Sequence, residues 1–239
     1  MKKLSWKLII LARIKWLAIA LTSTTAIGLS LPDCATADDI ALLQKLASTG
    51  DATSQFELGR EYEEGIDVPK DYAQAVAWYR KAANQGNVDA QKQLAWGYST
   101  GIIVQQDYAQ ANAWCRKAAD QGDAGAQDTM GWHYQKGLGV PRDYAQAVAW
   151  YRRAADQGNA GGLINLGLMY EKGKYVQQNN VITYALYNLA TTGDDLDLGA
   201  YHRDHFMKEM SEHEIELGQA LSQKMQSMGV TKAIDAYLK

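Results

Sequence analysis

The sequence predicts an all-α fold: an α/α superhelical solenoid of about four helix-turn-helix repeats, with helical caps at both ends. The first observation behind this prediction is a period of 36 residues, at which the block DYAQAVAWYRKAANQG of Asp71–Gly86 returns from Asp107 and again from Asp143. Self-similarity at a period of about 20 to 50 residues is the signature of a solenoid. The second observation is local: alanine-rich runs such as AQAVAWYRKAA favour helix, and the alternation typical of strands is nowhere sustained.

Residues 1–37 have the order of a bacterial secretory signal peptide. Five basic residues lie in the first fifteen positions, Trp16–Leu31 is largely apolar, and the small residues Ala35 and Ala37 mark a cleavage site. An uncleaved membrane anchor is the alternative, but sixteen residues with several Ser and Thr are short for crossing about 30 Å of hydrocarbon. We therefore expect a mature chain that begins at Asp38, does not insert into a membrane, and is periplasmic or secreted.

The mature chain is acidic and has a single cysteine. Removing the leader takes away five of the 24 basic residues and one of the 27 acidic residues, so 19 against 26 remain, a net charge of about −7. This balance argues against nucleic acid and anionic membranes as partners. Cys115 cannot form an internal disulfide, and its counterparts Tyr79 and Tyr151 in neighbouring repeats indicate an inert core thiol.

Residues 38–51 are predicted to form half a repeat. Their single helix ends at Gly50, which lies 36 residues before Gly86, the end of the first full unit. A solenoid needs its first apolar face covered, and a truncated unit is one way to cover it. We therefore expect residues 38–51 to be an N-terminal capping helix.

Residues 52–194 hold four full units of two helices each. The first helix of each unit ends at a glycine: Gly65, Gly101, Gly137 and Gly173. The second helix begins at an N-cap residue: Asp71, Asp107, Asp143 and Asn179. Three of these caps are followed by a glutamine at the spacing of a capping box: Gln74, Gln110 and Gln146. Three second helices also close at a glycine: Gly86, Gly122 and Gly158.

The fourth unit departs from the pattern and leads into a C-terminal helical cap, residues 195–239. Asn180 stands where the first unit has Tyr72, and such departures are common in a terminal repeat that meets a cap. Within the cap we expect a helix over 196–209, a second helix opened by a capping box at Ser211 and Glu214, and a short last helix.

The shared positions form the pattern A-x-x-x-L-G-x-x-Y-x-x-G-x-x-V-x-x-D-Y-x-x-A-x-x-W-Y-x-x-A-A-x-x-G over residues 52–194. This pattern closely resembles the Sel1-like repeat, a relative of the tetratricopeptide repeat, in four copies. The resemblance implies a right-handed superhelix of antiparallel helix pairs that binds a protein or peptide in its groove. For exported bacterial members it further implies a role in envelope signalling or in contact with a host.

Catalysis is the rival hypothesis, because some exported members of that family have been described as penicillin-binding or β-lactamase-like. Serine enzymes of that kind need S-x-x-K with a K-T-G partner, and the sequence has neither motif, no G-x-S-x-G elbow and no phosphate-binding glycine loop. We therefore expect no catalytic residue and no cofactor, with a cell-wall-related or β-lactamase-like envelope enzyme as the alternative. A self-assembling structural protein is a third hypothesis, although we expect a monomer.

The histidines offer one candidate metal site. His202 and His205 lie three residues apart with Glu209 four further on, so one helical face could present two nitrogens and a carboxylate to zinc. A solvated face of the capping helix is the alternative, and because no fourth ligand is visible we expect no bound metal. His133 and His213 are isolated, and we expect both to be exposed.

Tryptophans recur at two positions of the repeat. Those flanked by alanines in the second helices are predicted to be core residues: Trp78, Trp114 and Trp150. Trp96 and Trp132 instead share a first-helix position that carries Arg60 and Leu168 in the other units, so this position is not closed core.

By similarity to tetratricopeptide units, the position of Trp96 faces the concave groove, together with the position four residues earlier. The predicted partner-binding residues are therefore Phe56, Arg60, Lys92, Trp96, Trp132 and Leu168. The alternative is that the two tryptophans only seal contacts between adjacent first helices, because aromatic stripes at helical spacing are often core.

Overall fold

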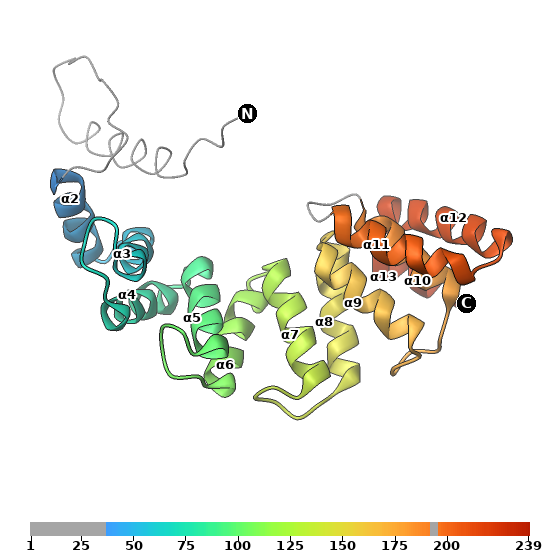
Figure 1. Cartoon of the computed structure of the whole chain (residues 1–239), viewed down its shortest axis with the longest axis horizontal. Helices are drawn as coiled ribbons and strands as arrows, with labels where there is room; N and C mark the ends of the chain where they lie inside the picture. Colours follow the sequence, from blue (N-terminus) through green and yellow to red (C-terminus); the bar gives the residue numbers. More distant parts are fainter. Residues whose placement is uncertain (1–36, 192–195) are drawn as a thin grey trace, which may run out of the picture.

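The computed structural model describes residues 37–191 and 196–239, which form twelve α-helices, α2 to α13, and one 3-10 helix, η1, with no strand among them. The helices lie side by side along an arc, with α2 at one end and α10 to α13 at the other (Figure 1). This arrangement confirms the predicted all-α solenoid. The predicted signal peptide lies outside the described residues, except for Ala37, where α2 begins. In the described ranges, no helix has the length and apolar character needed to cross a membrane.

Four pairs of helices follow one another as units 1 to 4. The first helices are α3 (Ala52–Glu64), α5 (Val88–Thr100), α7 (Ala124–Lys136) and α9 (Ala160–Glu171). The second helices are α4 (Tyr72–Asn84), α6 (Tyr108–Asp120), α8 (Tyr144–Asp156) and α10 (Asn180–Ala190). Each pair is joined by a loop with a glycine in left-handed backbone, which is the first loop residue in units 1 to 3, as at Gly65 with φ 70°, and the second in unit 4.

The predicted N-caps of the second helices are confirmed, but their capping boxes are wrong. The Asp71 carboxylate accepts from the backbone N–H groups of Ala73 and Gln74, and Asp107 makes the same two bonds. The side chains of Asp143 and Asn179 each accept from the N–H three residues later. In a capping box, Gln74 would accept from the Asp71 backbone N–H. That N–H instead donates to the carbonyl of Tyr62 at 2.8 Å, across the loop that joins the two helices. The capping box predicted at Ser211 and Glu214 is present.

The two helices of a unit meet where a glycine faces a buried tyrosine ring. A Cβ on Gly131 would lie 2.5 Å from the ring of Tyr151, which is fully buried, so only glycine permits this approach. The same pairing recurs in units 1 and 4 as Gly59 with Tyr79 and Gly167 with Tyr187. Each tyrosine hydroxyl donates a 2.6 Å hydrogen bond back to the first helix, to Glu63, Gln135 and Glu171.

Unit 2 replaces this pair on both sides at once. Ala95 stands where the other units have glycine, and Cys115 stands where they have tyrosine. The added methyl group on the first helix is thus matched by a smaller side chain on the second. Cys115 is buried, as predicted, and its thiol donates to the carbonyl of Ala126 at 3.3 Å. Burial raises the pKa of this thiol to about 12, which keeps it protonated and unreactive.

Adjacent units are joined by buried glutamines. Gln91 donates to the carbonyl of Ala83 in the preceding unit at 3.0 Å and accepts from the side chain of Gln121 at 2.8 Å. Gln55 and Gln127 make the same two bonds in units 1 and 3. Because each glutamine satisfies a carbonyl at the end of a neighbouring helix, the stacking of units is fixed by hydrogen bonds as well as by apolar burial.

Further helices cover both ends of the array. At the N-terminal end, α2 (Ala37–Ser48) packs Leu43 and Ala47 against Leu58 of α3. The C-terminal helices are α11 (Leu196–Phe206), η1 (Met207–Glu209), α12 (Glu212–Met228) and α13 (Val230–Tyr237). Here α12 packs on α10, and α13 returns to α8, where Arg152 and Asp235 form an ion pair at 3.1 Å.

The expectation that all three second-helix tryptophans are core residues holds only for Trp150, which is 3% exposed. Trp78 and Trp114 are half-buried, so this part of the prediction is wrong. Over each of their rings lies the ammonium group of the lysine three residues later, at 3.6 Å for Lys81 and 3.9 Å for Lys117. A cation over the ring face lets a partly solvated tryptophan remain favourable at this position.

Candidate functional site

Trp96 and Trp132 are the two large apolar side chains that the described first helices expose most, at 41% and 40%. They occupy equivalent positions on α5 and α7, in the two central units. Their exposure agrees with the prediction that this position is not closed core. Leu168, the equivalent residue on α9, is half-buried.

Polar contacts near the tryptophans hold the first helices side by side. Four residues before Trp96, Lys92 donates to Asp123 at the start of α7, at 3.0 Å. Four residues before Trp132, Asp128 accepts from Asn165 of α9 at 2.8 Å. The surface therefore runs continuously from α5 to α9. We call it the tryptophan face and define it by Lys92, Trp96, Asp128, Trp132 and Leu168.

Phe56 and Arg60 lie at the equivalent positions of α3, where the structure gives them partners within the chain. The ring of Phe56 is half-buried and lies 5.7 Å from that of Tyr79 in a tilted arrangement. The guanidinium of Arg60 bonds the carboxylate of Glu64 at 2.6 Å and lies 3.9 Å from Glu57. Both residues therefore already make contacts within the chain. Partner binding by these two residues remains a prediction.

Burial raises the pKa of Glu57, on α3 at this end of the array, from 4.5 to about 7, against the opposing charge of Arg60. A carboxyl whose pKa is higher in the folded chain favours folding while it is protonated, and this contribution is lost as the pH rises from about 4.5 to 7. We therefore expect Glu57→Gln to stabilise the protein by about 1 kcal/mol near pH 8, after allowance for solvent screening, and to have no such effect near pH 4. Thermal melts at the two pH values measure the difference.

The control for Glu57→Gln is Glu216→Gln, which neutralises a carboxylate that is 70% exposed on α12. Surface substitutions of this kind change stability little at any pH. If Glu57→Gln stabilised the protein equally at both pH values, the effect would not depend on ionisation. That result would contradict the raised pKa of Glu57.

The expectation that His133 is exposed is wrong. Its side chain lies beneath the tryptophan face, only 1% exposed, with Nδ1 2.6 Å from Oδ1 of Asn112. The amide of Asn112 donates to the carbonyl of Leu138 at 2.6 Å, so its oxygen is the acceptor and His133 Nδ1 carries the proton. Burial lowers the pKa of His133, which keeps the ring neutral. His213 is exposed, as predicted.

The candidate metal ligands do not gather into a site. In the ranges that the structure describes, no three His, Cys, Asp or Glu side chains are placed to share a metal ion. His202 instead lies against the ring of Tyr187 at 5.1 Å, and His205 stacks on Tyr201 at 6.2 Å. Burial lowers the pKa of His202 against the opposing charge of Glu171, and His205 and Lys172 lower it further.

Between α9 and α11 lies a cavity of about 510 Å³ that the sequence reasoning missed. Ten side chains line it: Leu168, Glu171, Gln178, Asn180, Tyr201, His202, His205, Phe206, Glu209 and Met210. Because Leu168 belongs to both, the cavity adjoins the tryptophan face. The signal in the sequence was Asn180, which stands where units 1 to 3 carry a tyrosine.

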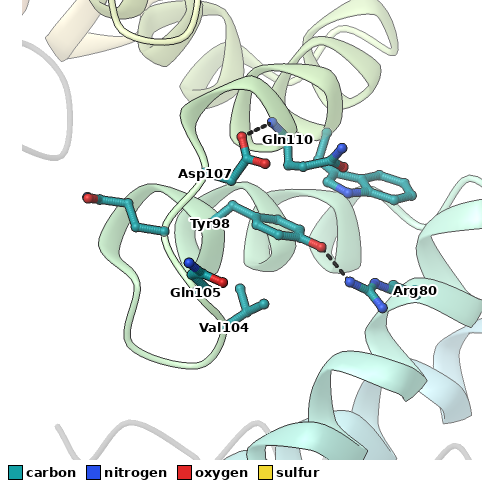
Figure 2. Close-up of a pocket in the computed structure, with 8 residues that line it drawn as sticks. Arg80, Tyr98, Val104, Gln105, Asp107 and Gln110 are labelled. Carbon is teal, nitrogen blue, oxygen red and sulfur yellow. Dashed lines mark hydrogen bonds between the residues drawn. The ribbon is translucent and has the colours of Figure 1, made fainter.

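A second cavity, of about 560 Å³, lies between α4 and the loop before α6 (Figure 2). Arg80 donates to the hydroxyl of Tyr98 across it, and Asp107 accepts from the backbone of Gln110 as the N-cap of α6. The arginine contact recurs between later units as Arg116 with Tyr134 and Arg152 with Tyr170. This cavity therefore lies at a contact that is repeated between successive units.

A family model and two solved structures are similar to this chain. A family model for the Sel1 repeat matches residues 52–87, 88–123, 124–159 and 160–195. A solved Sel1 repeat protein from Oxalobacter formigenes is 28% identical, with 78% of each chain covered and a TM-score of 0.64. A protective antigen of uropathogenic Escherichia coli strains that displays an SLR fold is 29% identical, over 82% of this chain and 50% of that one, with a TM-score of 0.49. No curated protein matches.

Proposed function

Because the chain belongs to the Sel1 repeat family, we propose that it is a scaffold that binds a protein or peptide partner on the tryptophan face. Sel1 repeats generally mediate protein interactions. The observation that carries the proposal is the exposure of Trp96 and Trp132, at 41% and 40%, on neighbouring first helices. Tryptophan is among the residues that most often dominate binding energy at interfaces.

The surroundings of the tryptophans suit a binding surface. Lys92 and Asp128 place a polar side chain four residues before each of the two indoles, as in an apolar anchor with a polar rim. The enzyme hypothesis has less support, since neither cavity described above is lined by a serine or cysteine that could act as a nucleophile.

We further propose that the scaffold works outside the cytoplasm, in envelope signalling or in contact with a host. The support is the order of basic, apolar and small residues in 1–37, which is that of a cleaved leader. On this proposal the working chain begins at Asp38. Its partner would then also be an envelope, extracellular or host protein.

Photo-crosslinking in the native host tests both proposals. A benzophenone amino acid is placed at Thr100 and Lys136, exposed residues four positions after the two tryptophans, and in separate chains at Ala113 and Ala149, exposed on the second helices. We expect adducts with one partner from the first pair of positions and none from the second pair. The mass of the recovered chain should correspond to a start at Asp38.

Adducts that form equally from all four positions, or from Ala113 and Ala149 alone, would rule out the tryptophan face as the binding surface. A chain that retains Met1 would rule out the cleaved leader. The two results are independent, so a failure of one proposal leaves the other standing.

A further inference from the structure

The cavity between α9 and α11 lies where one ring of the repeat is missing. In units 1 to 3 the second helix starts with a half-buried tyrosine: Tyr72, Tyr108 and Tyr144. Tyr108 points its ring at the next first helix, where it meets His133 edge-on at 6.4 Å. In unit 4 this position holds Asn180, and about 510 Å³ stays open beneath α11.

The walls of this cavity combine an apolar part with hydrogen-bond acceptors. Leu168, Phe206 and Met210 supply the apolar part. Glu171 and Glu209 supply two carboxylates, and no lysine or arginine lines the cavity. One oxygen of Glu171 accepts from the hydroxyl of Tyr187 at 2.6 Å, which fixes this carboxylate in place.

We propose that this cavity binds a basic side chain, preferably arginine, of the peptide that lies on the tryptophan face. A guanidinium group has five donors and no acceptor, so it complements a wall that carries the carboxylates of Glu171 and Glu209. Its methylene stem suits Leu168 and Met210, and its planar group suits the ring of Tyr201, which is 66% exposed at the cavity.

The position of the cavity and the charge of the chain both support a basic occupant. A peptide that passes Trp96 and Trp132 reaches Leu168 next, and Leu168 also lines the cavity. The chain carries a net charge of −3, which the predicted loss of the leader would make more negative, so a basic partner is favoured over an acidic one. This inference rests on the proposed function, because it assigns the cavity to the same partner.

A small probe tests the cavity without the partner. N-acetyl-arginine amide is titrated into the protein while the ring signals of His202 and His205 are followed by NMR, with N-acetyl-citrulline amide as the uncharged analogue of the same shape. We expect saturable shifts with the arginine probe at roughly millimolar concentration, as its size allows, and none with citrulline. Equal shifts with both probes, or no shift with either, would overturn the proposal.

Three variants sharpen the result. Glu171→Gln with Glu209→Gln removes both charges and should weaken probe binding about tenfold or more. The first change is structurally mild, because Gln135 already accepts from Tyr151 at 2.6 Å in unit 3. Asn180→Tyr restores the ring of the other units and should abolish probe binding. Glu216→Gln, outside the cavity, is the control and should leave it unchanged.

Retained probe binding in both the double variant and Asn180→Tyr would overturn the proposal, since the probe would then sit elsewhere. The measurement involves no partner protein. Its outcome is therefore separate from that of the crosslinking, and the cavity can fail while the tryptophan face stands.

Discussion

Replacing Trp150 with alanine is expected to lower the free energy of unfolding by about 3 to 5 kcal/mol. The indole is 3% exposed and lies in one cluster with Cys115 of unit 2 and Met130 of unit 3, so its removal opens a cavity between two central units. The change also removes a ring that lies 4.4 Å from the guanidinium of Arg153. Denaturant unfolding followed by circular dichroism measures the loss.

Trp114→Ala provides the matched control, because it removes the same side chain at the same position of unit 2. Trp114 is half-buried beneath Lys117, so we expect a smaller loss of about 1 to 2 kcal/mol. Equal losses for the two variants would mean that the burial of the tryptophan does not determine how much it contributes to the free energy of unfolding. The sequence alone predicted one environment for both tryptophans, and this comparison measures how far they differ.

The period of 36 residues was enough to predict the fold. It places an N-cap, a closing glycine and a helical run at the same point of every unit, and these local signals act within a few residues of each other. Helix ends were therefore predictable from the residues next to them in the sequence. The failed capping boxes mark the limit: the Asp71 N–H bonds to Tyr62, nine residues away across a loop, and helical spacing does not report that contact.

The sequence did not show which of the residues that differ from the repeat pattern contact one another in the fold. Ala95 and Cys115 change together, as do Asn112 and His133, because each pair meets across two helices. A period identifies which residue is unusual, but the facing partner depends on how helices pack. For this reason His133 was expected in solvent. In the structure its buried partner is Asn112, which stands where units 1 and 3 have a valine.

Only part of the candidate site was predictable from the sequence. A position occupied by Arg60, Trp96, Trp132 and Leu168 within one array indicated a surface, and the two tryptophans are indeed exposed. The contacts of Phe56 with Tyr79 were not predictable, because they depend on the gap that Gly59 leaves for that ring. The cavity at Asn180 was also missed, since it needs α11 to cover the space of the absent tyrosine.

The double substitution Trp96→Ala with Trp132→Ala is expected to abolish partner binding at concentrations that saturate the native protein. An anchoring tryptophan commonly contributes about 2 kcal/mol or more, which is roughly 30-fold in affinity for each residue. Both indoles are about two-fifths exposed, at 41% and 40%, so the melting temperature should fall less than for Trp150→Ala. Titration of the crosslinked partner, once purified, and a thermal melt of the same sample measure the two effects.

The control removes as many exposed apolar residues from elsewhere on the array: Ile66→Ala with Ile102→Ala, which lie in loops and are 54% and 55% exposed. This variant should bind normally, because exposed apolar area by itself does not make an anchor. If the tryptophan variant binds normally as well, the partner uses another surface. If its melting temperature collapses, the two indoles hold adjacent first helices together, and the alternative of a sealed seam between units is correct.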